Sequence, residues 1–264
     1  MHRLLWACLV LSLSSPAAAR TTTEEHLLAA VGAFRAGDYD AALIELRVVE
    51  RASDAPPDLA FYLGPTLYKL GRYREALATF LASPAPPDAL TEFYLGQTYY
   101  QLRLYRKSLQ VFTALRGRGL GPKLAAAAEK YEHAVEATFA AAPPEGAVDF
   151  YLAAGRALLP GEPRLAAEYL DEARLVATLT SSERLYADAL AALGAAWNAC
   201  GRPDAVIALL RDGPSSSASQ RELARAYVAV GDHARARPLL ERLAASGGEL
   251  APEARALLLH LGGR

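Results

Sequence analysis

Cysteine is scarce in this chain of 264 residues, which has only two, and neither sign of charge prevails. Lysine and arginine number 28 against 29 aspartates and glutamates, so no broad electrostatic field favours binding to nucleic acid or to an anionic membrane. β-branched residues are also sparse, which argues against a sheet. Hydrophobic residues make up 52 %, too many for a disordered chain, and the abundant alanine and leucine favour helices.

Long apolar runs are missing beyond the amino terminus, so we expect no integral membrane span in the mature chain. The first residues have the three parts of a secretory signal: a basic start at Arg3, an apolar run from Leu4 to Leu13, and small residues at 17–19. We therefore predict a cleaved signal peptide over residues 1–19, with a retained anchor as the alternative. Cleavage leaves Cys200 as the one cysteine, which excludes an intrachain disulfide.

The strongest signal in the sequence is an internal repeat. Residues 61–64 (Phe-Tyr-Leu-Gly) recur at 93–96, and each copy is followed by a tyrosine-bearing turn of helix and a break. Gly71 marks the first break, and Arg103 takes the place of glycine in the second. Similar breaks begin at Gly37, Gly201 and Gly231. Glycine at these places can adopt a left-handed conformation and end a helix, whereas the small Gly64 lets neighbouring helices lie close together.

This pattern resembles the tetratricopeptide repeat (TPR). The resemblance implies an all-α fold, a right-handed α-solenoid of antiparallel helix pairs in which each pair packs on its neighbours. We place repeat units near 23–56, 57–87, 88–118, 147–180, 182–213 and 217–248. The expected organisation is three TPR-like pairs over 20–118, an irregular connecting helix over 119–146 without an obvious partner, and further TPR-like units with a capping helix over 147–264.

In proteins of this family, the first helices of successive units line a concave groove that holds a peptide. Carried onto this sequence, the resemblance predicts a groove rich in aromatic residues, which are frequent in binding hot spots. Its predicted residues are Leu27, Val31, Phe34, Phe61, Tyr62, Tyr68, Lys69, Phe93, Tyr94, Gln97, Tyr100 and Gln101. The alternative is that some of these aromatic residues, such as Phe61 and Phe93, belong to the core.

Some family members hold a peptide carboxylate with lysine, asparagine and arginine. The matching positions here are mostly apolar, so we expect a partner peptide rich in apolar or aromatic residues. Those positions hold Leu27, Val31, Phe61, Pro65, Phe93 and Gln97.

Residues that would indicate catalysis do not form a motif, so we expect no enzyme activity, no catalytic residues, no metal and no cofactor. Glu129 and His133 lie one helical turn apart and could share a metal, but a solvated surface pair explains them without further ligands. Cys200 has no nearby histidine or acid in the sequence that would activate it as a nucleophile.

Together these patterns predict a non-enzymatic scaffold or adaptor of the bacterial cell envelope that binds a protein or peptide of unknown identity and no nucleic acid. We expect it to be exported to the periplasm, with secretion or the outer envelope as alternative destinations. The alternative function is a structural subunit that associates with itself in an envelope assembly.

Overall fold

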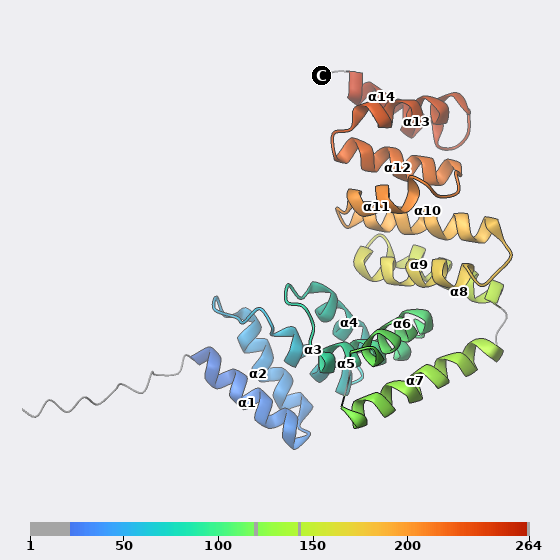
Figure 1. The fold of residues 1–264 in the computed structure, drawn as a ribbon. Helices are drawn as coiled ribbons and strands as arrows, with labels where there is room; N and C mark the ends of the chain where they lie inside the picture. Colours follow the sequence, from blue (N-terminus) through green and yellow to red (C-terminus); the bar gives the residue numbers. More distant parts are fainter. Residues whose placement is uncertain (1–21, 119–120, 142–143, 263–264) are drawn as a thin grey trace, which may run out of the picture. The chain divides into compact units, whose positions relative to one another are not determined.

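The structure, a computed structural model, describes residues 22–118, 121–141 and 144–262. Residues 1–19, the predicted signal peptide, lie outside the described residues. The described part contains fourteen α-helices and no strand, which confirms the all-α prediction (Figure 1). The helices are α1 (Thr22–Ala36), α2 (Tyr39–Arg51), α3 (Ala60–Lys69), α4 (Tyr73–Ala82), α5 (Ala89–Gln101), α6 (Tyr105–Arg116), α7 (Pro122–Ala141), α8 (Pro144–Leu158), α9 (Pro163–Ala177), α10 (Glu183–Ala199), α11 (Pro203–Leu210), α12 (Ser217–Ala229), α13 (His233–Ala245) and α14 (Ala251–Gly262).

The chain divides into two compact units, of which the first ends at Pro56 and the second begins at Pro57. In the first unit, α1 packs on α2. Gly37 has φ +83° and reverses the chain, and the Asp38 side chain accepts a hydrogen bond from the Ala41 amide to start α2. The predicted segments 20–118, 119–146 and 147–264 remain a prediction, as does the right-handed superhelix.

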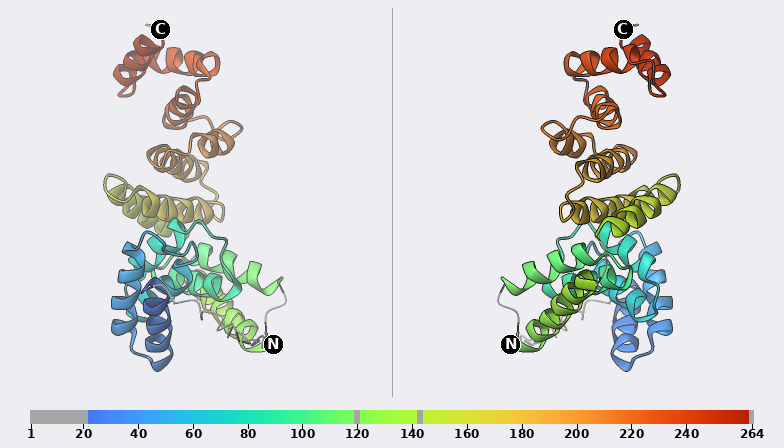
Figure 2. Two further views of the ribbon diagram at one scale, coloured as in Figure 1. Left: turned by 90° about the vertical axis from the view of Figure 1, so that its left-hand side faces the viewer. Right: turned by 90° about the vertical axis from the view of Figure 1, so that its right-hand side faces the viewer.

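In the second unit, successive helices pack as pairs: α3 on α4, α5 on α6, α8 on α9, and α12 on α13. Layers follow one another from α8 to α14, which is visible for the yellow-to-red helices in both views of Figure 2. α7 packs on α6 and also contacts α5, so the helix expected to lack a partner has one. None of the described helices is long and apolar enough to span a membrane.

Gly64 and Gly96 occupy equivalent places in two helix pairs. A Cβ atom on Gly64 would lie 2.1 Å from the Phe80 ring, and one on Gly96 would lie 2.8 Å from the Phe112 ring. Both glycines are therefore required for close approach of the first helix to the second. Ser108, where the repeat usually has alanine, is fully buried and donates a hydrogen bond to the Gly96 carbonyl oxygen at 2.9 Å. The 32-residue repeat in the sequence thus corresponds to a repeated packing contact.

Several of the chain reversals between paired helices use left-handed backbone. Gly71, Gly201 and Gly231 have φ values of +73°, +68° and +78°, as their places in the repeat predicted. Arg103 stands at the position that corresponds to Gly71 and has φ +62°. The reversals are otherwise alike, because the amides of Gly71 and Arg103 donate to the carbonyls of Tyr68 and Tyr100 at the same distance of 3.0 Å.

Replacing Arg103 with glycine is expected to stabilise the protein. A left-handed conformation costs a residue with a Cβ atom about 1 kcal/mol, and glycine avoids this cost. The greater freedom of glycine in the unfolded chain offsets part of this gain. We expect the free energy of unfolding of Arg103→Gly to rise by roughly 0.5 kcal/mol, measured by urea denaturation. The reverse change, Gly71→Arg, serves as the matched variant and should lower it. A loss of stability in Arg103→Gly would contradict the conformational explanation.

The hairpin of α8 and α9 packs back against the corner between α5 and α6. Tyr151 of α8 donates a hydrogen bond to the Arg103 carbonyl oxygen. Glu172 of α9 is fully buried, and its carboxylate accepts hydrogen bonds from the amides of Arg106 (2.6 Å) and Lys107 (2.8 Å). These amides belong to the first turn of α6, so a residue 66 positions away in the sequence caps this helix.

Candidate functional site

Side chains from α3, α5 and α7 form a cluster rich in tyrosine. Tyr68 on α3 packs edge-on against Tyr94 on α5, with ring centroids 5.5 Å apart. Tyr100 on α5 packs in the same way against Tyr131 on α7, at 5.2 Å. We call this set the tyrosine cluster. Its members are Tyr68, Lys69, Tyr94, Gln97, Tyr100, Gln101 and Tyr131.

Polar contacts connect the rings of the tyrosine cluster. The Gln97 amide nitrogen donates to the Tyr131 hydroxyl at 2.9 Å, and the Lys69 ammonium lies 5.8 Å from the centre of the Tyr94 ring. The Tyr68 hydroxyl interacts with both Tyr131 and Gln101. Burial raises the pKa of Tyr68 well above its usual value, and the neighbouring Tyr131 raises it further. This hydroxyl therefore stays protonated.

The cluster combines ring surface with hydrogen-bonding groups. The four tyrosine rings are half-buried, and Lys69 and Gln101 are exposed. Half-buried tyrosines offer rigid apolar area together with a polar tip, which suits contacts with a partner. The cluster therefore has the chemistry of a binding surface and lacks a nucleophile paired with a base.

Six of the predicted groove residues thus lie together: Tyr68, Lys69, Tyr94, Gln97, Tyr100 and Gln101. The structure places Phe93 in the core, where it is buried against Phe112 and Tyr131, so for Phe93 the alternative of a packing role applies. Phe61 and Tyr62 are half-buried near the start of α3. Among the described residues, no ring contact joins either of them to the cluster.

The remaining predicted residues, Leu27, Val31 and Phe34, lie on α1 in the first unit and are half-buried. Phe34 packs edge-on against Tyr39, with ring centroids 5.3 Å apart. The same pairing across a helix–helix corner recurs in the second unit between Tyr68 and Tyr73 at 5.4 Å. Part of the ring surface of these residues is therefore used within the helix pair itself.

Tyr131 is a member of the cluster that the sequence analysis missed. α7 is rich in alanine and lacks the Leu-Gly signature, so it was expected to be a connecting helix. The signal that could have identified Tyr131 is its distance of 34 residues from Gln97, its hydrogen-bond partner. This separation is close to the 32-residue spacing between Gly64 and Gly96, which places α7 one repeat after α5 in the sequence.

Other groups considered for chemistry lie apart from the cluster. Within the described ranges, no set of three or more histidine, cysteine, aspartate or glutamate side chains is placed to hold a metal. His133 and Glu129 form an exposed pair 3.8 Å apart. Cys200 is half-buried at the end of α10, and burial raises the pKa of its thiol, which disfavours the reactive thiolate.

Comparisons with known proteins add the following. No protein-family model and no curated protein matches the sequence. Several of the solved structures to which the chain is similar are tetratricopeptide repeat proteins. The TPR2AB-domain:pHSP90 complex of yeast Sti1 is 16 % identical, with 89 % of this chain and 96 % of that chain covered and a TM-score of 0.37.

Two bacterial proteins show a similar degree of likeness. A thermophilic TPR protein from Thermus thermophilus is 18 % identical, with 90 % and 99 % of the two chains covered and a TM-score of 0.30. A tetratricopeptide repeat protein from Parabacteroides merdae is 13 % identical, with 90 % and 98 % covered and a TM-score of 0.33. The repeated glycine–phenylalanine packing, and not these distant likenesses, supports the assignment of TPR-like helix pairs in this chain.

Proposed function

We propose that this protein is a non-enzymatic scaffold that binds a protein or peptide through the tyrosine cluster. The observation that carries the proposal is the convergence of Tyr68, Tyr94, Tyr100 and Tyr131 from three helices. Rigid rings of this kind lose little conformational entropy on binding, and their hydroxyls can bond to a peptide backbone. Lys69 is the only charged member of the cluster. Because the rest of the cluster is uncharged and rich in rings, it favours a partner segment with apolar or aromatic side chains.

We further propose that the protein acts in the bacterial cell envelope, with the periplasm as its destination. Residues 1–19 support this proposal through their basic, apolar and small-residue segments. Expression of the full chain and sequencing of the amino terminus of the exported product tests it. A product that begins near residue 20 in the periplasmic fraction is expected, and a chain that keeps Met1 in the cytoplasm would contradict export.

The binding surface can be tested by removing two rings at once. In the double variant Tyr94→Ala and Tyr100→Ala, capture of specific partners from an envelope extract should fall by roughly tenfold or more, because each binding hot spot contributes more than about 1 kcal/mol. The measurement is quantitative mass spectrometry of the captured proteins, with circular dichroism to show that the helices persist.

The matched control is Phe150→Ala on α8. Phe150 is an exposed aromatic residue outside the cluster, with 53 % of its surface accessible, so its removal should leave capture unchanged. Equal capture by the folded double variant and the parent protein would contradict the proposed surface.

A further inference from the structure

The side of α2 that faces away from its buried residues carries two large apolar side chains. Ile44 and Val48 lie one helical turn apart, and 66 % and 41 % of their surfaces are accessible, whereas Leu46 and Val49 are buried. We call Ile44 and Val48 the α2 stripe. The other exposed large apolar side chains of the described residues lie singly, each in a different helix or loop, as is common on protein surfaces.

The other helix pairs do not have this stripe at the equivalent places in their sequences. Ile44 and Val48 lie seven and eleven residues after the reversal at Gly37. The same places after the reversals at Gly71, Arg103, Gly201 and Gly231 hold Ala78 and Ala82, Gln110 and Ala114, Ala208 and Asp212, and Pro238 and Arg242. None of these is a large aliphatic residue. Because β-branched residues also lower helix propensity, neither the repeat nor the stability of α2 explains the stripe.

Two oppositely charged residues flank the α2 stripe on the same face of the helix. Asp40 lies in the first turn of α2 and Arg51 in its last turn. Both are exposed, and neither side chain forms a hydrogen bond or an ion pair within the ranges that the structure describes. The face therefore has an apolar centre, a negative end and a positive end.

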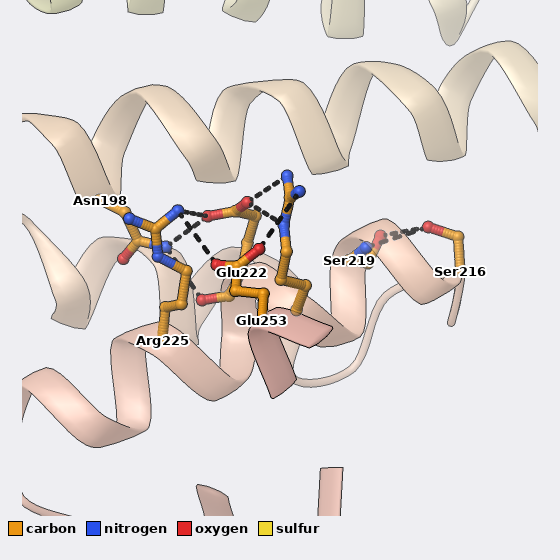
Figure 3. A network of polar contacts seen from close by, with 7 residues as sticks. Asn198, Ser216, Ser219, Glu222, Arg225 and Glu253 are labelled. Atoms are coloured by element: carbon orange, nitrogen blue, oxygen red, sulfur yellow. Dashed lines mark hydrogen bonds and ion pairs between the residues drawn. The ribbon is translucent and has the colours of Figure 1, made fainter. Parts of the chain in front are cut away.

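Charged residues near the carboxyl-terminal end of the second unit are used differently. The fully buried carboxylate of Glu222 accepts a hydrogen bond from the Asn198 amide at 2.8 Å and lies 2.7 Å from the Arg221 guanidinium. Figure 3 shows Asn198 and Arg225 converging on Glu222, with Glu253 of α14 beside them. The charges of this network are paired within the chain, whereas those beside the α2 stripe are not.

An antiparallel pair of α2 helices from two copies of the chain would cover the stripe and pair the charges together. Along the helix, the midpoint between Asp40 and Arg51 lies about half a residue from the midpoint between Ile44 and Val48. A two-fold axis at this point places Ile44 of one copy against Val48 of the other, and it brings Asp40 beside Arg51 twice. A parallel pair would instead bring like charges together at both ends.

We propose that this protein forms a two-fold symmetric dimer through antiparallel contact of two α2 helices. Charge complementarity decides the occupant of the stripe, because the face is complementary to itself only in this orientation. Two apolar residues from each copy bury less area than the roughly 1,200 Å² of a standard interface, so the dimer is reversible, with a dissociation constant on the order of 100 µM. The contact belongs to the first unit and does not depend on the tyrosine cluster.

Reversal of the charges gives the first test. Sedimentation velocity of the purified protein between about 5 µM and about 500 µM should show a monomer that converts to a dimer. Asp40→Arg and Arg51→Asp should each weaken association by about tenfold, because like charges then meet twice. The variant with both changes restores opposite charges across the two-fold axis and should dimerise like the parent protein.

A parent protein that stays monomeric throughout this range would overturn the proposal. So would a doubly reversed variant that associates as weakly as the single variants while circular dichroism shows intact helices. A dimer of parallel helices would give this second outcome, since the double reversal would again bring like charges together.

Variants of the apolar residues give the second test. Ile44→Gln combined with Val48→Gln should weaken association by about tenfold or more. The matched control is Leu259→Gln, which removes a single leucine of α14 with 79 % of its surface accessible and should leave association unchanged. Loss of the dimer in this control or in the double tyrosine variant would place the contact elsewhere and overturn the proposal. Partner capture by the Ile44 and Val48 variant should match that of the parent protein, so failure of the dimer and failure of the tyrosine cluster are distinguishable.

Discussion

Replacing Glu172 with alanine is expected to lower the free energy of unfolding by about 3 kcal/mol at about pH 5. The change leaves the amides of Arg106 and Lys107 without their acceptor, and each buried unsatisfied donor costs about 1 to 3 kcal/mol. It also leaves a cavity, since no part of the Glu172 side chain reaches solvent. Urea denaturation monitored by circular dichroism measures the loss.

The contribution of Glu172 should depend on pH. Burial raises its pKa to about 7 from the usual 4.5, although the two amide donors and Lys107 favour the ionised form. Between these two values the native state binds more protons than the unfolded state, so stability from this group falls as pH rises. The total loss between about pH 4 and pH 8 is about 3 kcal/mol.

Glu172→Gln serves as the control for this dependence. Glutamine keeps one acceptor oxygen and does not titrate, so its stability relative to the parent protein should improve steadily as pH rises through this window. The groups that interact with Glu172 and titrate elsewhere, including Lys107 and Tyr151, are the same in both proteins and cancel in the comparison. A constant difference between parent and variant from pH 4 to pH 8 would show that Glu172 does not change protonation there.

Replacing Gly96 with alanine should cost about 2 kcal/mol, although alanine is the better helix former. The new methyl group would lie 2.8 Å from the ring of Phe112, which is fully buried and cannot move without displacing the core. Overpacking of this kind typically costs 1 to 3 kcal/mol, which exceeds the gain in helix propensity of about 1 kcal/mol. The measurement is again urea denaturation.

Gly32 provides the matched control for this substitution. It lies within α1, and a Cβ atom there would have no neighbour within 4 Å. Gly32→Ala should therefore raise stability by about 0.5 to 1 kcal/mol through helix propensity alone. Opposite signs for the two glycines are the expected result. A stabilising Gly96→Ala would show that the helices of this pair are not in close contact.

Much of the fold could be predicted because the packing of the repeat requires particular residue types at fixed places in the sequence. Gly64 and Gly96 mark places where a helix meets an aromatic ring, and Gly71, Gly201 and Gly231 mark left-handed reversals. Each is a local requirement that few other residues satisfy, so the residue type alone indicates the structure.

The contacts between distant helices could not be predicted in the same way. Nothing in the residues near Glu172 indicates that it caps α6, because a glutamate in a helix is usually exposed. Tyr131 was missed for a related reason, since α7 lacks the glycine and leucine signature of a first helix.

The return of α9 to the corner between α5 and α6 has a consequence for how this protein could change in evolution. Repeat proteins commonly lengthen or shorten by duplication or deletion of whole units, because each unit depends only on its neighbours. Here an added pair between α6 and α8 would have to leave Tyr151 and Glu172 within reach of the same backbone groups. Duplication and deletion are therefore restricted between α5 and α9, and the more freely variable part of this array begins after α9.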